Sequence, residues 1–233
     1  SSNRTGGNGA DDIYLFVEKT CYQIMDGVVS DIDSKGGVVG VELLFFDGQN
    51  KVVDKIYTDE QGYYSAEKLL CGNQYNVQVN KEGYFTKEFV VDINRDIQQR
   101  VNIEIELINK GDDLFKKLKL APIHFDFDSA TIRPDAQIEL QKVVDVLLKH
   151  PTIQLDVRSH TDSRGNDAYN LKLSERRAQA TIQWMIGQGI EASRLTGRGY
   201  GETQLVNSCS NGVDCSEEQH QENRRSEFIV MDM

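Results

Sequence analysis

The hydrophobic pattern of this 233-residue chain changes its period near the middle. From Cys21 to Leu107 short apolar runs of alternating type recur about every ten residues, with Gly- and Asp-containing turns between them. The last run alternates at Val101, Ile103 and Ile105, and no window in this stretch has helical spacing. Short, evenly spaced strands of this kind predict an Ig-like antiparallel β-sandwich of about seven strands over residues 20–108.

After a polar linker at 109–120, strands and helices alternate over residues 121–233. Pro134 is suited to the first turn of a helix, and the apolar residues after it are spaced three and four apart. They are Leu140, Val143, Val144, Leu147 and Leu148, and a second stripe contains Ala178, Ile182 and Met185. Strands are predicted at 123–127, 153–157, 194–200 and 226–231. The pattern predicts a two-layer domain with helices on one face of a mixed sheet, which makes the whole chain α+β.

The composition is that of a folded globular protein, with 39% hydrophobic and 27% charged residues. A net charge of −11 disfavours binding to nucleic acid or to anionic lipid through basic residues. No apolar run approaches the roughly 20 residues of a membrane-spanning helix. The chain begins within a longer pattern, so it is expected to be a piece of a larger protein.

The four cysteines are not spaced as zinc ligands or as a CxxC pair. Cys209 and Cys215 bracket a short polar loop that a disulfide would close, and Cys21 and Cys71 form the other possible pair. An even count favours an oxidising compartment. The alternative is four buried free thiols in a cytosolic protein.

A charged stretch at 159–180 places Asp162 in a Gly-containing loop and Arg177 on the helix that follows. The charges form either an ordinary solvated face, which the charge pattern alone favours, or a pocket for a ligand of both signs. A helix that begins at Asp167 would place Arg177 about 15 Å along its axis. Either the loop folds back, or the helix begins later with Ser174 as its N-cap. We expect a folded-back loop, with the Asp162 carboxylate and the Arg177 guanidinium within about 8 Å of each other.

Four motifs in order resemble the OmpA-like C-terminal domain, of the OmpA/Pal/MotB superfamily, over Ala121–Met233. They are "IHFDFDSATIRPDA", "HTDSRGNDAYNLKLSERRAQA", "GIEASRLTGRGYGET" and "NRRSEFIV". The resemblance implies non-catalytic binding of the peptidoglycan stem peptide through diaminopimelate, which carries an ammonium and a carboxylate. It therefore favours the pocket over the solvated face.

The resemblance also implies the roles of individual residues. Asp162 is the expected anchoring acid and Arg177 the expected anchoring base. Supporting positions are Thr161, Asn170, Leu173, Ser174, Arg224 and Asp128. Two features depart from many relatives: Arg164 stands where a smaller residue is common, and a cysteine-bracketed segment at 206–221 replaces a shorter loop that borders the pocket.

The N-terminal region has resemblances of its own. Residues 20–108 resemble a carboxypeptidase-regulatory-like domain, in "GVVSD", "VVGVELLFFDGQNKVV" and "YTDEQGYYSAEKLLCGNQYNVQVNKEGYF". This implies a β-sandwich spacer or interaction module and not a peptidase. Residues 1–19 resemble the last strand of a β-propeller repeat.

Catalysis and metal binding are not predicted. His160, Thr161 and Asp162 are adjacent at a strand end and do not all aim at one point. Asp126 and Asp128 share a strand face, but no Gly-rich ligand loop surrounds them. We expect no catalytic residue, no metal and no cofactor.

The domain order resembles envelope proteins of Gram-negative Bacteroidota. The expected protein is periplasmic and associated with the outer membrane, and it anchors the envelope to the cell wall. Its expected partners are peptidoglycan and an outer-membrane or secretion-system protein. A protein–protein scaffold with a secondary wall site is the alternative, and a wall-cleaving hydrolase is the least favoured function.

Overall fold

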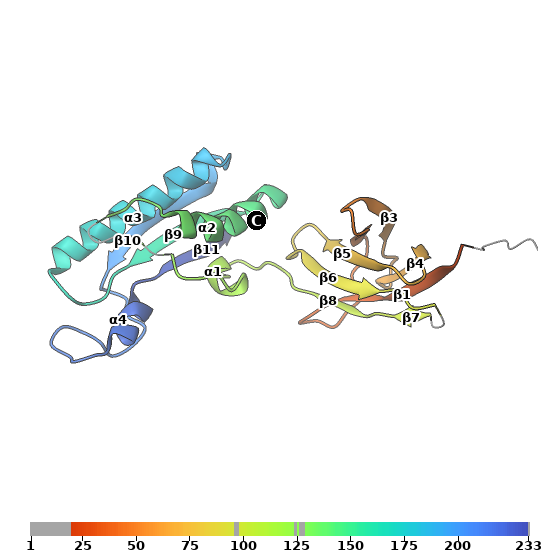
Figure 1. Ribbon diagram of the computed structural model, residues 1–233. Coiled ribbons are helices and arrows are strands. Elements are labelled where there is room, and N and C mark those ends of the chain that lie inside the picture. Colours follow the sequence, from red (N-terminus) through yellow and green to blue (C-terminus); the bar gives the residue numbers. More distant parts are fainter. Residues whose placement is uncertain (1–19, 96–97, 124, 126–128, 233) are drawn as a thin grey trace, which may run out of the picture. The chain divides into compact units, whose positions relative to one another are not determined.

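The computed structural model describes residues 20–95, 98–123, 125 and 129–232. The chain divides into two compact units, which are treated separately here (Figure 1). The described part of the N-terminal unit lies within residues 20–81 and 86–106, and that of the C-terminal unit lies within 82–85 and 107–232. The terminal strand predicted within residues 1–19 lies outside the described residues.

Two four-stranded sheets make up the N-terminal unit. In the first, β4 (Tyr63–Leu70) and β7 (Gln99–Arg100) flank β1 (Tyr22–Asp31), and β8 (Ile103–Ile105) also pairs with β1. The second has the order β3-β2-β5-β6 and is antiparallel throughout. Its strands are β3 (Val52–Tyr57), β2 (Glu42–Phe46), β5 (Gln74–Asn80) and β6 (Lys87–Asp92).

Buried apolar side chains alternate along the central strands of both sheets. On β2 these are Leu43 and Phe45, on β5 Val77 and Val79, and on β1 Met25 is fully buried. Period-two burial shows that one face of each sheet is buried. The predicted disulfide between Cys21 and Cys71 is confirmed.

The expectation of wholly antiparallel sheets is wrong at the end of this unit, because β7 and β8 both run parallel to β1. The run that alternates at Val101, Ile103 and Ile105 forms two short strands, β7 and β8, with a break between them. Val101 N donates to Asp26 O at 2.8 Å, and the Asn102 side chain accepts from Val28 N at 3.1 Å. Alternation along a segment indicates which residues face the core and carries no information about the direction of the neighbouring strand.

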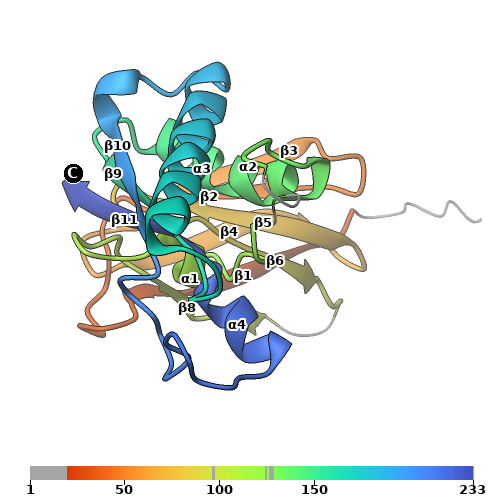
Figure 2. The same cartoon turned by 90° about the vertical axis from the view of Figure 1, so that its left-hand side faces the viewer.

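The C-terminal unit has the predicted two layers. Its sheet has the order β10-β9-β11, in which β9 (Gln154–His160) is parallel to β10 (Leu195–Gly201) and antiparallel to β11 (Ser226–Asp232). Helices α2 (Pro134–Lys149) and α3 (Asp167–Gly187) cover one face of this sheet, as Figure 2 shows. The shorter helices are α1 (Leu114–Lys117), η1 (Ala192–Arg194) and α4 (Glu217–Asn223).

The core of this unit lies between α2, α3 and the sheet. The predicted stripes are buried at Leu140, Val143, Val144 and Leu147 and at Ala178, Ile182 and Met185, together with Phe228 of β11. Leu148 was expected in the first stripe but is 53% exposed, because it lies about 100° around the helix from Leu147. Of the strand predicted at 123–127, only Ile123 and Phe125 are described, and neither lies in a strand. Within the described residues, no helix has the length and apolar character needed to cross a membrane.

Helix α3 packs closely against the edge strand β10, and Gly199 permits this approach. A Cβ atom at Gly199 would lie 2.1 Å from the Glu175 backbone N and 2.3 Å from Ser174 Oγ. Ser174 Oγ accepts from Gly201 N at 2.8 Å, and the Glu175 carboxylate accepts from Gly199 N at 2.7 Å. The helix side chains thus occupy backbone donors of β10 and fix the helix beside the end of the sheet.

Candidate functional site

The loop that carries Asp162 folds back over the first turn of α3. The helix begins at Asp167, and its N-cap Asn166 accepts a hydrogen bond from Tyr169 N at 3.2 Å. Asn170 Nδ2 donates to the backbone oxygens of Asp162 (3.3 Å) and Arg164 (3.1 Å). The loop is therefore folded back against the first turn of α3. The expected approach of the Asp162 carboxylate to within about 8 Å of the Arg177 guanidinium stays a prediction. The later helix start capped by Ser174 is wrong, because Ser174 lies inside α3 and is fully buried.

The Asp162 carboxylate is held between two arginines. Its Oδ2 atom accepts from Arg224 Nη1 at 2.5 Å and from Arg164 Nη2 at 2.7 Å, and its Oδ1 atom accepts from Arg164 N at 3.0 Å. The side chain is only 9% exposed. Burial alone would raise its pKa, but the hydrogen bonds from Arg164 and Arg224 outweigh burial and hold the pKa of Asp162 below its usual value.

Glu217, at the start of α4, completes a four-residue cluster with Asp162, Arg164 and Arg224. Its carboxylate accepts from Arg164 Nη1 at 2.8 Å and from Arg224 Nη2 at 2.6 Å. We call this group the Asp162 cluster. Two carboxylates and two guanidiniums leave it without net formal charge. The sequence pattern did not single out Glu217, because it contacts Arg164 across 53 residues of chain.

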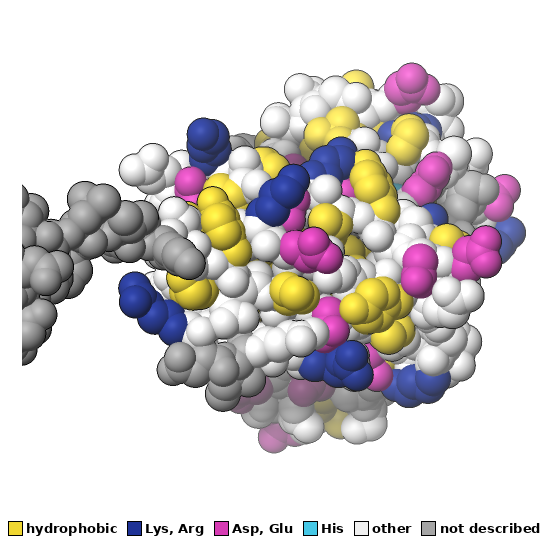
Figure 3. All heavy atoms as spheres, turned by 90° about the vertical axis from the view of Figure 1, so that its right-hand side faces the viewer, with side chains coloured by type: hydrophobic (Ala, Val, Ile, Leu, Met, Phe, Trp, Pro, Cys, Tyr) yellow, Lys and Arg dark blue, Asp and Glu magenta, His cyan; other side chains and the backbone are white. Residues whose placement is uncertain are grey.

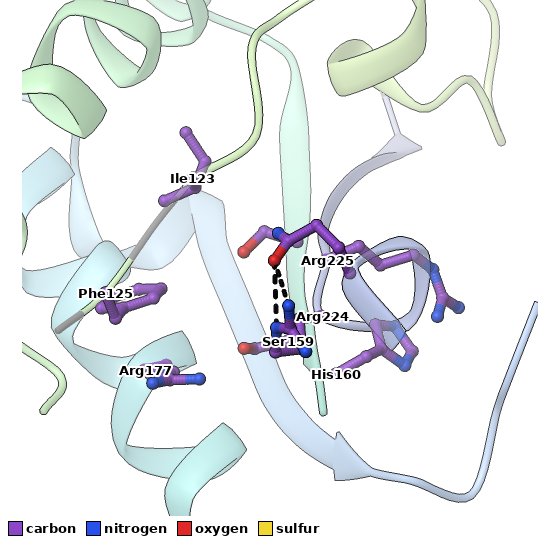
Figure 4. Close-up of a pocket in the computed structure, with 9 residues that line it drawn as sticks. Ile123, Phe125, Ser159, His160, Arg177, Arg224 and Arg225 are labelled. Carbon is purple, nitrogen blue, oxygen red and sulfur yellow. Dashed lines mark hydrogen bonds between the residues drawn. The ribbon is translucent and has the colours of Figure 1, made fainter. Parts of the chain in front are cut away.

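Arg177 lies on α3 and is half-buried. Its Nε donates to the Ser129 backbone oxygen at 3.1 Å, and its guanidinium lies 4.7 Å from the centre of the Phe125 ring. Stacking on an aromatic ring fixes the plane of a guanidinium. Figure 4 shows Phe125 beside Arg177 at one side of a pocket.

This pocket has a volume of about 110 Å³, and three arginines line it. Two of them, Arg224 and Arg225, are ion-paired with carboxylates that do not line it. Among the described residues that line it, none is acidic. The lining residues are Ile123, Phe125, Ser159, His160, Arg177, Gln221, Arg224, Arg225 and Ser226. A guanidinium binds a carboxylate through paired, charge-assisted hydrogen bonds. In a chain of net charge −11, this basic pocket is suited to a ligand carboxylate.

Arg224 connects the pocket with the Asp162 cluster, because it lines the former and donates to Asp162 in the latter. A basic pocket therefore lies next to a buried acid, which is the charge arrangement that a zwitterionic ligand requires. Closure of Asp162 and Arg177 on one ligand group stays a prediction.

The supporting positions have varied surroundings. Thr161 is buried, and its Oγ1 atom has no hydrogen-bond partner among the described residues. Asn170 is 3% exposed and also donates to Glu202 at 2.6 Å, and Leu173 is 8% exposed. Asp128, and Asp126 with it, lies outside the described residues.

The predicted disulfide between Cys209 and Cys215 is confirmed, and it lies beside the Asp162 loop. Ser163 Oγ donates to the Cys209 backbone oxygen at 2.6 Å, and Cys209 is fully buried. The cysteine-bracketed loop thus supports the loop that presents Asp162.

The ring of His160 makes contacts on the side of Tyr200 and Glu227. It stacks on Tyr200 with 5.2 Å between ring centres, and its Nε2 atom lies 3.6 Å from Glu227 Oε2. The contact with His160 is the main cause that lowers the pKa of Glu227 to about 2, against burial and with help from Arg225. In the described parts of the chain, no group of three or more His, Cys, Asp or Glu side chains is placed to hold a metal.

A family comparison agrees with this architecture. Residues 124–219 match the OmpA family. The matched residues lie within the C-terminal unit.

Three similar proteins illustrate the relationship. The peptidoglycan-associated lipoprotein of Agrobacterium fabrum is 37% identical over 123 residues, which cover 53% of this chain and 62% of that protein. A segment of 110 residues is 44% identical to part of the photosystem I P700 chlorophyll a apoprotein A2 of Gloeobacter violaceus, and covers 46% of this chain and 12% of that protein. The solved structure of the cell wall anchor of the T6SS from Pseudomonas aeruginosa is 31% identical, with a TM-score of 0.41, and the match covers 47% of this chain and 75% of that one. The chain spans less than two thirds of the length of both curated relatives.

Proposed function

We propose that the C-terminal unit binds peptidoglycan without catalysis and anchors an outer-membrane-associated protein or assembly to the cell wall. The ligand is the diaminopimelate of the stem peptide. Asp162 binds its free ammonium, and Arg177 and Arg224 bind its free carboxylate. The observation that carries this proposal is the basic pocket, whose lining residue Arg224 also contacts the buried acid Asp162.

The chemistry of the two halves supports this assignment. A carboxylate of depressed pKa stays charged at neutral pH and is able to hold an ammonium. A guanidinium oriented by an aromatic ring forms a fork for a carboxylate. The match to the OmpA family, and the relative named peptidoglycan-associated lipoprotein, support the same ligand class.

The two disulfides are consistent with an oxidising compartment, which for a wall-binding protein is the periplasm. We further propose that the N-terminal unit is an Ig-like, carboxypeptidase-regulatory-like spacer, and that the parent protein belongs to a Gram-negative bacterium of the Bacteroidota type.

Protein–protein scaffolding is the second candidate function. Tyr22, Tyr57 and Val90 of the N-terminal unit are each more than half exposed. Figure 3 shows hydrophobic side chains on one face of this unit, separated by charged and polar ones. Dispersed apolar side chains are normal on protein surfaces, whereas a docking site usually presents a contiguous patch. Wall binding is therefore the better supported function.

Co-sedimentation with purified diaminopimelate-type sacculi tests the proposal. We expect the parent protein to sediment with sacculi, and Asp162→Ala and Arg177→Ala to remain largely in the supernatant. Lys142→Ala, a change on α2 at an exposed pair with Glu139, serves as the control that sediments like the parent. Equal sedimentation of all four proteins would show that the site is assigned wrongly. Release of soluble muropeptides by the protein alone would indicate a hydrolase.

A further inference from the structure

Arg164 donates more side-chain hydrogen bonds to the Asp162 carboxylate than any other side chain of the described residues. Its Nη2 and Nε atoms lie 2.7 and 3.2 Å from Asp162 Oδ2, and its backbone N donates to Oδ1 at 3.0 Å. A spacing of two residues keeps this guanidinium near the acid at little cost in chain entropy.

Arg164 is also the more solvent-exposed of the two arginines in the Asp162 cluster. Its side chain is 51% exposed, whereas the side chain of Arg224 is 25% exposed. Arg224 is further held by Gln221 through its Nε atom at 3.1 Å. A cation that approaches Asp162 from solvent therefore competes first with Arg164.

Glu217 keeps Arg164 in this position. Its carboxylate accepts hydrogen bonds from both terminal nitrogens of the Arg164 guanidinium, from Nη1 at 2.8 Å and from Nη2 at 3.4 Å. Hydrogen bonds from Arg164, followed by those from Arg224, lower the pKa of Glu217, so this carboxylate is charged at neutral pH. The formal charges of the Asp162 cluster thus cancel without a ligand, which reduces the attraction of the cluster for an external ammonium.

We propose that Arg164 is an internal competitor for the ammonium position on Asp162, and that Glu217 is the latch that holds it there. This inference rests on the proposed function and deepens it. When the stem peptide binds, its ammonium replaces Arg164 on Asp162, and the Arg164 guanidinium either keeps only its contact with Glu217 or moves to solvent. A ligand that offers a cation alone exchanges one guanidinium contact for one ammonium contact. A ligand that also places a carboxylate against Arg177 and Arg224 gains a second interaction, so the competitor raises selectivity for zwitterionic groups.

Calorimetric titration of the full chain tests this role. The probe is an N-acetylated tripeptide that ends in diaminopimelate, and the proteins are the parent, Arg164→Ala, Glu217→Gln, Asp162→Ala and the control Lys142→Ala. The Arg164→Ala and Lys142→Ala variants are matched, since each removes one cation from an ion pair. The side chains removed are similarly exposed, Arg164 by 51% and Lys142 by 49%. We expect Arg164→Ala to bind about two- to fivefold more tightly than the control, as removal of an exposed ion pair allows. Glu217→Gln should shift the affinity in the same direction by less.

A second probe, the same tripeptide with its remaining amine acetylated, separates competition from a general change in charge. We expect the advantage of Arg164→Ala to vanish with this probe, because it has no ammonium. Suppose that the parent binds the first probe, that Asp162→Ala abolishes this binding, and that Arg164→Ala binds no more tightly than the parent. This result would overturn the role of Arg164 as a competitor and leave the proposed function intact. Absence of binding by both the parent and Arg164→Ala would overturn both. Thermal unfolding followed by Trp184 fluorescence verifies that each variant is folded, since this single tryptophan lies on α3.

Discussion

Asp162 and Arg224 lie 62 residues apart in the sequence, and their side chains meet at 2.5 Å in the C-terminal unit. This pair joins the loop after β9 to the chain that enters β11, next to the basic pocket. Because both side chains are mostly buried, removal of Arg224 leaves a carboxylate with one partner fewer in a poorly solvated position.

Arg224→Ala is therefore expected to lower the free energy of unfolding of the C-terminal unit by about 1.5–3 kcal/mol, the range for a hydrogen bond to a charged group. The measurement is urea unfolding followed by Trp184 fluorescence. Sacculus binding should fall as well, because the pocket loses a guanidinium. Lys142→Ala is the reference, and a stability equal to that of this reference would contradict the pairing.

The stability of the C-terminal unit should depend on pH through Asp162. Its folded pKa lies below the value of about 3.9 that an unfolded chain has. The charged form therefore contributes stability that is complete above about pH 5 and is lost as the pH falls through the folded pKa. We expect the stability difference between the parent and Asp162→Asn to narrow from pH 7 to pH 3 in urea titrations. A difference that stays constant over this range would exclude the linkage.

The close packing of α3 on β10 gives a prediction with an internal control. Gly199→Ala places a Cβ atom 2.1 Å from the Glu175 backbone, so the helix or the strand must move. We expect a loss of about 3 kcal/mol or more, typical of overpacking against backbone. Gly187→Ala, at the end of the same helix, meets nothing within 4 Å and should be neutral or slightly stabilising. Similar melting temperatures for the two variants would show that the approach is looser than described.

The Cys209–Cys215 disulfide is expected to stabilise the Asp162 loop. It closes a short ring, for which the chain-entropy model gives about 2 kcal/mol. The double variant Cys209→Ala, Cys215→Ala should unfold at correspondingly lower urea when followed by Trp184, and it should bind sacculi more weakly. The double variant Cys21→Ala, Cys71→Ala should leave the Trp184 transition in place, because that disulfide lies in the N-terminal unit. Unchanged unfolding and sacculus binding in the Cys209→Ala, Cys215→Ala variant would contradict the role of this disulfide in supporting the Asp162 loop.

Local patterns predicted most of the C-terminal layers. The stripe at Leu140, Val143 and Leu147 and the alternation at Leu155 and Val157 correctly identified the buried faces. These signals depend on periodicity within one element, which the sequence displays directly. The direction of β7 and β8 beside β1 is set by pairing across more than 70 residues, as in the contact of Val28 with Asn102, and such pairing has no local signature.

The sequence likewise identified some residues of the site and not others. The motif resemblance singled out Asp162, Arg177 and Arg224, and the folded-back loop followed from the length of α3. The role of Glu217 was missed, because it enters the Asp162 cluster from a segment that departs from the pattern of relatives. A pair of acids with two arginines gives no sequence signal when its members come from two segments that are about 50 residues apart, the loop with Asp162 and Arg164 and the helix α4 with its C-cap Arg224.

The most direct test of wall binding through diaminopimelate is the ratio of dissociation constants for two soluble stem peptides. One ends in diaminopimelate and the other in lysine, which has the same ammonium and lacks the second carboxylate. Loss of a charged hydrogen-bonded pair corresponds to about 10- to 100-fold in affinity. We predict that the parent prefers the diaminopimelate peptide by about this factor, and that Arg177→Ala loses most of the preference while it retains weak binding to both peptides. Equal affinity of the parent for the two peptides would contradict the proposed recognition of diaminopimelate.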